Sequence, residues 1–123
     1  MIAPLDSAWA AYSGRTNTII ITPQVLEDIP AAVAVVFVHE LRHAAQQVEG
    51  MTDCVGREVD SLVWEMRFWD LLTNGGVLKP TTQLQTEENY LLRIALEEGE
   101  PGLYKYIVTS PGYQEQCQID PPY

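Results

Sequence analysis

One short stretch, residues 36–47 (VFVHELRHAAQQ), constrains this chain more than any other. It carries both histidines of the sequence, His39 and His43, and Glu40 directly follows the first. Because four residues make about one turn of an α-helix, both imidazoles point from one helix face and can bind one metal ion. Glu40 lies about 100° further round the helix, where its carboxylate can reach a water on that metal without being a ligand. The pattern is typical of zinc sites, in which the metal lowers the pKa of a water and a carboxylate accepts its proton.

The same spacing also arises by accident on exposed helices. Here an apolar run, AAVAVVFV at residues 31–38, leads directly into His39 and indicates a helix that is buried at this point. Buried histidines and a buried glutamate are costly unless they are paired or bound to a metal. We therefore expect His39 and His43 to be metal ligands. A purely structural helical domain with incidental histidines is the rival interpretation.

Length and charge narrow the function classes. The chain of 123 residues predicts one domain, 1–123, and no apolar run is long enough to span a membrane. The net charge of -10, without any Lys/Arg cluster, argues against nucleic-acid binding. The first residues lack a basic region and include Asp6, so they do not resemble a signal peptide, and we expect a cytoplasmic protein.

Two cysteines, Cys54 and Cys117, are too few for a disulfide scaffold. In a reducing cytoplasm we expect free thiols. The alternative is a single bridge that ties the tail to the second main helix.

Turn residues divide the chain into a hairpin and three helices. The β-branched run at residues 18–22 and Gly14 before it predict a β-hairpin over 8–22. Pro30 and Gly50 predict the start and the end of a helix over 30–48, with Asp28 as a candidate N-cap.

Caps and turn residues also set the bounds of the elements after residue 50. Asp53 as N-cap and the turn residues after Thr73 predict a helix over 53–72. A third helix is predicted over 86–98, and the tail at 110–123 is predicted to be extended, because it is rich in turn residues. Residues 103–108 fit a helix or a strand. The predicted fold class is α+β, mainly α, with a small hairpin packed on the histidine-bearing helix and the helix that follows it.

A catalytic zinc site usually has three protein ligands, so a third is needed beside the histidines. Glu58 and Glu65 lie at the edge of the apolar stripe of the 53–72 helix. A carboxylate is unfavourable there unless it is paired or bound to a metal. They stand two turns apart, about 10 Å, so only one is expected to reach the metal. The other downstream carboxylates considered are Glu49, Asp53 and Asp60.

These other carboxylates are weaker candidates. Asp60 projects away from the apolar stripe, toward the expected solvent face, and Asp53 is explained as a helix cap. Glu49 stands six residues after His43, as the third ligand does in H-E-x-x-H-x-x-G-x-x-H enzymes, but Gln46 replaces the glycine that such a turn needs.

The helix pair resembles the gluzincin branch of the zincin metallopeptidases, including its minimal members. Those proteins carry H-E-x-x-H on an active-site helix and Glu-x-x-(Ala or Ser) on a following glutamate helix, and residues 58–61 (EVDS) fit the second motif. The resemblance covers about residues 8–72. It implies a hairpin whose edge strand pairs with the substrate, and a small residue, Ser61, where the helices approach. It also implies one zinc ion with the ligands His39, His43 and Glu58, and Glu40 as catalytic general base and acid.

The chain departs from the gluzincin pattern at two points. Many gluzincins brace a zinc-binding histidine with an aspartate where this chain has Leu62, so the histidines must be oriented by other residues. No third histidine is present to stabilise an oxyanion. The candidate substitutes are Tyr12, Tyr104, Tyr106 and Tyr113.

The resemblance implies a zinc-dependent metallopeptidase that hydrolyses peptide bonds through a metal-activated water, with Glu40 as general base. The alternative is a catalytically silent or latent zinc-binding module with a regulatory or binding role. Its cleft would be closed by a partner or by the tail, with Asp120 or the carboxylate of Tyr123 at the zinc. The expected partner is a peptide or protein substrate, with no nucleic acid and no membrane, and the oligomeric state stays open.

Overall fold

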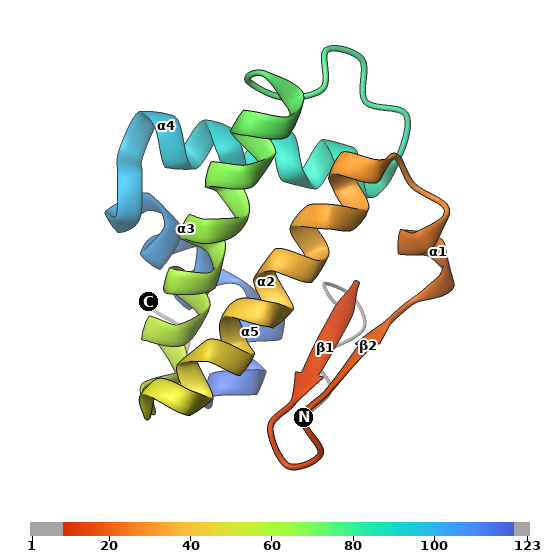
Figure 1. Ribbon diagram of the computed structural model, residues 1–123. Helices are drawn as coiled ribbons and strands as arrows, with labels where there is room; N and C mark the ends of the chain where they lie inside the picture. Colours follow the sequence, from red (N-terminus) through yellow and green to blue (C-terminus); the bar gives the residue numbers. More distant parts are fainter. Residues whose placement is uncertain (1–8, 120–123) are drawn as a thin grey trace.

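Two long antiparallel helices, α2 (Pro30–Glu49) and α3 (Cys54–Thr73), lie side by side at the centre of the molecule (Figure 1). The structure is a computed structural model and describes residues 9–119. Its class is α+β, mainly α, as predicted from the sequence. Both central helices match their predicted ranges to within one residue at each end.

Local signals explain where these two helices begin and end. Pro30 occupies the first turn of α2, and Gly50 ends it in the left-handed conformation at φ 75°. Asp53 caps α3 by accepting a hydrogen bond from the backbone N–H of Gly56. The expected cap at Asp28 is wrong, because Ile29 is the N-cap of α2 and makes no side-chain cap bond.

Asp28 instead joins distant parts of the chain. Its carboxylate accepts hydrogen bonds from Thr82 Oγ1 at 2.7 Å and from Gln85 Nε2 at 2.8 Å. Thr82 in turn caps α4 (Gln83–Thr109) by accepting from the backbone N–H of Gln85. The start of α4 is thereby fixed next to the start of α2.

The predicted hairpin is confirmed. Strand β1 (Ala10–Ser13) pairs antiparallel with β2 (Thr18–Ile21), with Tyr12 opposite Ile19. β1 packs on α2, on the side that faces away from α3 (Figure 1). A single helical turn, α1 (Pro23–Leu26), connects the hairpin to α2.

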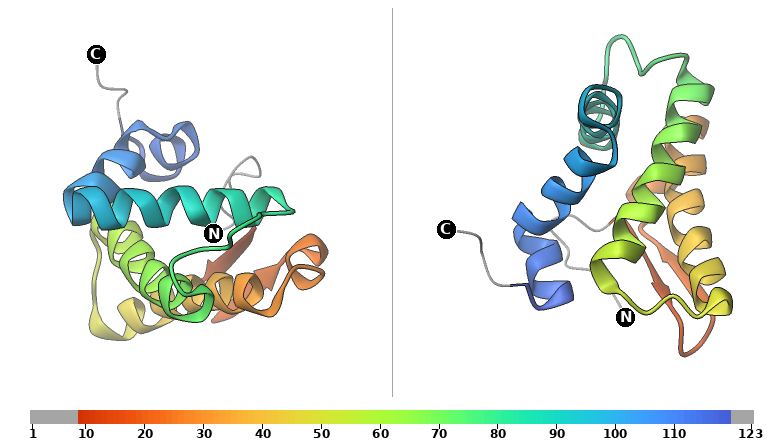
Figure 2. Two further views of the ribbon diagram at one scale, coloured as in Figure 1. Left: turned by 90° about the horizontal axis from the view of Figure 1, so that it is seen from above. Right: turned by 90° about the vertical axis from the view of Figure 1, so that its left-hand side faces the viewer.

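The C-terminal third is more helical than expected. The helix predicted over 86–98 begins three residues earlier and, after a kink at Gly99 (φ 67°), continues to Thr109. The expectation of an extended tail is wrong for the described residues, because α5 (Pro111–Cys117) is a helix. Pro101 and Pro111 stand in the first turn after the kink and at the start of α5, where proline favours a helix. α4 and α5 follow one another along one side of the α2–α3 pair (Figure 2).

The core lies where α2, α3 and α4 meet. Trp69 of α3 is fully buried, and its indole N–H donates to Asn89 Oδ1 on α4 at 3.1 Å. The apolar stripe predicted on α3 packs here, with Leu62 and Met66 beside Trp69. Because this stripe faces α2, the glutamates at its edge are brought opposite the histidines. No helix within residues 9–119 has the length and hydropathy needed to span a membrane.

Candidate metal centre

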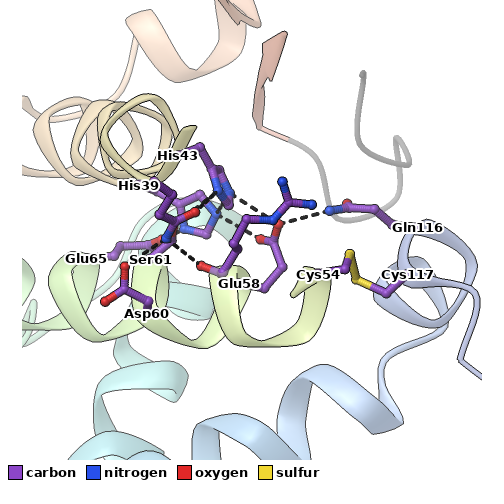
Figure 3. A network of polar contacts seen from close by, with 11 residues as sticks. His39, His43, Cys54, Glu58, Asp60, Ser61, Glu65, Gln116 and Cys117 are labelled. Carbon is purple, nitrogen blue, oxygen red and sulfur yellow. Dashed lines mark hydrogen bonds and ion pairs between the residues drawn. A yellow bond between two sulfur atoms is a disulfide. The ribbon is translucent and has the colours of Figure 1, made fainter. Parts of the chain in front are cut away.

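The two histidines of α2 and Glu58 of α3 converge on one point. The Nε2 atoms of His39 and His43 are 3.2 Å apart. Glu58 Oε1 is 3.2 Å from Nε2 of His39, and Glu58 Oε2 is 3.2 Å from Nε2 of His43. Figure 3 shows the three side chains pointing toward one another across the helix pair. Among the described residues, these three form the group of His and carboxylate side chains that could hold a metal ion.

The donor set fits a zinc ion. In a tetrahedral site with bonds of about 2.0–2.1 Å, neighbouring ligand atoms stand about 3.3–3.4 Å apart, close to the separations seen here. The Nδ1 atom of His39 lies 2.6 Å from Glu65 Oε1, and that of His43 lies 2.9 Å from Gln46 Oε1. When both Nδ1 atoms carry the proton, two imidazole lone pairs and a carboxylate face each other at Nε2 and need a cation between them.

The pKa shifts of His39 and Glu58 also indicate that this site favours a positive charge. Burial lowers the pKa of His39, but hydrogen bonds to Glu58 and Glu65 outweigh burial and raise it well above the usual range. Burial raises the pKa of Glu58, yet the hydrogen bonds from His39 and His43 prevail and hold it well below the usual range. A proton on His39 can therefore supply the charge that a metal ion would otherwise supply.

Glu58 and Glu65, left as alternatives by helix geometry, are separated by the structure. Glu65 contacts His39 on the Nδ1 side of the ring, away from the point where the Nε2 atoms meet. A carboxylate in that place fixes the tautomer and the orientation of a metal-binding imidazole. Glu58 belongs to the group that could hold a metal ion, and Glu65 lies where a carboxylate can orient His39.

The other carboxylates lie outside the group. Glu49 is exposed and pairs with Arg42 at 3.3 Å, and Asp53 caps α3. The expectation that Asp60 points to solvent is only partly right. Its carboxylate turns back to α2, where it accepts from Arg42 Nε at 2.6 Å and from Gln46 Nε2 at 2.7 Å.

Glu40 lines the same cavity as the three candidate ligands. It is 6% exposed, and burial raises the pKa of its carboxyl. Electrostatic interactions with the two histidines of α2 oppose this shift, whereas those with Glu58 and Glu65 add to it. A carboxylate with a raised pKa beside a candidate metal site is suited to accept a proton.

The cavity has a volume of about 510 Å³. Strand β1 forms part of its wall, and α4 and α5 contribute further residues, among them Glu88, Leu91 and Gln116. Of the candidate oxyanion donors, Tyr12, Tyr106 and Tyr113 line this cavity, whereas Tyr104 is 54% exposed and lies outside it.

The pKa of Tyr113 is affected by the carboxylates of the candidate site. Burial raises the pKa of its hydroxyl well above the usual value, and the charges of Glu58 and Glu65 raise it further. The hydroxyl therefore keeps its proton and can donate a hydrogen bond.

The cysteines correct one expectation. Cys54 and Cys117 are joined in a disulfide, with their Cα atoms 5.6 Å apart. The expectation of free thiols is therefore wrong, and the alternative of a single bridge is confirmed. Next to it, Gln116 Nε2 donates to Glu58 Oε2 at 2.9 Å (Figure 3). Cys54 lies one turn before Glu58 on α3, so the bridge and the hydrogen bond join the same two helices. Disulfides are typical of oxidising compartments, and the cytoplasmic location stays a prediction.

The site thus brings together two imidazoles and one carboxylate, suited to a transition metal, and a further buried carboxylate in the same cavity. Sequence reasoning found Glu58 and Glu40 but missed Gln46, which entered only as a residue replacing a glycine. No protein-family model, no curated protein and no solved structure matches this chain.

Proposed function

We propose that the protein is a zinc-dependent peptidase of gluzincin type. The observation that carries the proposal is the convergence of His39, His43 and Glu58 at separations of 3.2 Å, within a cavity that Glu40 also lines. Two histidines and one glutamate form a known ligand set of hydrolytic zinc, which leaves one coordination position for water or substrate. The resemblance of HELRH and EVDS to the two gluzincin motifs supports the same choice.

The residues of the chain have separate tasks in this proposal. A bound zinc ion supplies Lewis-acid polarisation of the scissile carbonyl and lowers the pKa of a water. Glu40 takes the proton of the attacking water and returns it to the leaving amine. Tyr113 donates a hydrogen bond to the oxyanion that develops on the carbonyl.

Strand β1 is proposed to hold the substrate. Ala10 and Ala11 of this strand line the cavity. In gluzincins, which this chain resembles, the corresponding hairpin holds an extended substrate through main-chain hydrogen bonds. In this proposal the scissile bond lies between the hairpin and α2, next to Glu40.

Removal and return of zinc test the proposal directly. The purified protein is expected to bind about one zinc ion, measured by mass spectrometry of metals, and to lose peptide cleavage when a chelator removes it. Zinc at one hundred times its Kd is expected to stabilise the fold by about 2.7 kcal/mol, measured as a rise in Tm. Magnesium is the control and should restore neither property, because it prefers oxygen ligands. Zinc binding without cleavage of a broad peptide library would refute the peptidase and leave the metal site.

A second candidate function, a latent zinc-binding module, is favoured by one contact. The side-chain amide of Gln116 on α5 donates a hydrogen bond to Oε2 of Glu58, which is a proposed metal ligand. The residues first expected to close the cleft, Asp120 and Tyr123, lie outside the described part of the chain. In this proposal α5 limits access to the metal position, and Gln116 competes with the metal for Glu58.

Gln116→Ala separates the two candidates. Hydrogen bonds to charged groups contribute about 1.5–3 kcal/mol, so a latent protein should gain at least about tenfold in zinc affinity and in kcat/KM for peptides. The matched control is Gln114→Ala, because Gln114 lies on the same helix and bonds to the Val108 carbonyl instead of the site. Equal rates for Gln116→Ala and the unaltered protein would count against latency and leave the peptidase proposal standing.

A further inference from the structure

Gln46 is a fully buried polar side chain that neither the H-E-x-x-H motif nor the third ligand explains. It lies on α2 just under one turn after His43 and has 0% of its surface exposed. Its side-chain oxygen, Oε1, lies 2.9 Å from His43 Nδ1. Burying an amide is costly unless its donors and acceptor are all used, so these contacts need an account.

The surroundings of Gln46 settle which way its amide points. Its nitrogen, Nε2, faces three oxygen atoms on α3: the carbonyl of Arg57 at 2.9 Å, Asp60 Oδ2 at 2.7 Å and Ser61 Oγ at 3.2 Å. Two of these, the carbonyl and the carboxylate, only accept hydrogen bonds. A flipped amide would put its own oxygen against them, which is repulsive. Oε1 must therefore face His43.

This orientation decides the tautomer of His43. An amide oxygen only accepts hydrogen bonds, so Nδ1 of His43 must carry the proton and donate it to Oε1. The lone pair of the ring is then on Nε2, the atom that points toward Nε2 of His39 and the carboxylate of Glu58. The result is the form of histidine that a metal ion requires.

Asp60 anchors the amide at its other end. The carboxylate of Asp60 also accepts from Arg42 Nε at 2.6 Å, so it is held from two sides. Hydrogen bonds in such a chain polarise one another, and the carboxylate makes the Oε1 atom of Gln46 a better acceptor. The two histidines thus have different braces: a carboxylate, Glu65, for His39, and an amide backed by a carboxylate for His43.

We propose that Gln46, anchored by Asp60, is a positioning residue of the metal centre: it holds His43 in the tautomer and orientation that offers Nε2 to zinc or a similar transition metal. The proposal rests on the metal site of the proposed function and does not require peptide hydrolysis. It also accounts for the glutamine at this place in the chain, next to a helix that carries Leu62 where gluzincins often carry a bracing aspartate.

The test uses the full chain and zinc affinity rather than activity. Gln46→Met keeps the side-chain length but removes every hydrogen bond, and it should weaken zinc binding about 10- to 100-fold in a chelator competition. The matched control is Gln85→Met, because Gln85 is 2% exposed and bonds to Asp28 and Thr81 away from the metal centre. The control should lower Tm without changing zinc affinity. Unchanged zinc affinity in folded Gln46→Met would overturn the role of Gln46, whether or not the unaltered protein cleaves peptides.

Asp60→Asn is the second variant, for the case in which Gln46→Met does not fold. Asp60 is partly exposed and lies at the far end of the hydrogen-bond chain that runs through Gln46 to His43. Its replacement should weaken zinc binding several-fold, less than Gln46→Met. The visible spectrum of the cobalt-substituted protein should also shift, since it reports the placement of the ligands. Asp70→Asn, on the same helix but outside the network, should leave affinity and spectrum unchanged. If Asp60→Asn has the affinity and the spectrum of the unaltered protein, Asp60 does not anchor Gln46 and that part of the proposal is wrong.

Discussion

Replacing Glu40 with glutamine is expected to abolish peptide hydrolysis while zinc stays bound. Glutamine has the shape of glutamate but cannot take a proton from the attacking water. General-base catalysis contributes about 10²- to 10⁴-fold, so kcat/KM should fall by at least that factor, or about 3–5 kcal/mol in the barrier. The measurement pairs kcat/KM for a cleaved peptide with zinc content and zinc affinity of the same preparation.

Retention of zinc is the sharper half of this prediction. Glu40 lines the cavity but is not in the group formed by His39, His43 and Glu58, so an uncharged replacement leaves that group intact. Glu97→Gln is the control, because Glu97 is exposed on α4, outside the cavity. If Glu40→Gln cleaves peptides at the rate of the unaltered protein, Glu40 is not the base and a gluzincin-type mechanism does not apply.

The part of the site that could be predicted from sequence is the part that local geometry decides. His39, Glu40 and His43 share one helix, where a spacing of four places two side chains on one face. Helix projection also reduced the candidates for the third ligand to Glu58 and Glu65, because both carboxylates lie at the edge of the apolar stripe. The central helix pair was predictable for similar reasons, since its caps at Asp53 and Gly50 are local signals.

The division of roles between Glu58 and Glu65 was not predictable in this way. Both lie on the same edge of α3, and both contact His39, one at each ring nitrogen. Which of the two lies near Nε2 depends on how far α3 is shifted along α2, and residue spacing within α3 does not determine that shift. The resemblance chose Glu58, whereas residue spacing alone allowed either.

The errors in the C-terminal third have a common cause. Residues that are typical of turns can also start a helix: proline favours the first turn, and Pro101 and Pro111 both stand at such starts. The tail was thus predicted to be extended. Without α5, the bridge between Cys54 and Cys117 is only an alternative to free thiols, and nothing in the sequence brings Gln116 next to Glu58.

Removing the disulfide is expected to have the second large effect, on stability. The bridge closes a loop with a sequence separation of 63 between Cys54 and Cys117. In the chain-entropy model, opening a loop of this length costs about 4 kcal/mol, within the usual range of about 2–5 kcal/mol for small domains. Cys54→Ser/Cys117→Ser should therefore lower the free energy of unfolding by about that amount, measured by urea denaturation of the metal-free protein.

The same variant should also release α5 from the metal centre. α5 is held otherwise by the Gln116–Glu58 bond, by Gln114 on the Val108 carbonyl and by the ring contact of Tyr113 with Tyr106. With the bridge absent, zinc should exchange faster, as measured by transfer to a chelator. A reductant should reproduce both effects in the unaltered protein and do nothing to the double serine variant. Equal unfolding free energies and equal exchange rates would mean that the thiols are free, and that α5 stays on Glu58 through noncovalent contacts alone.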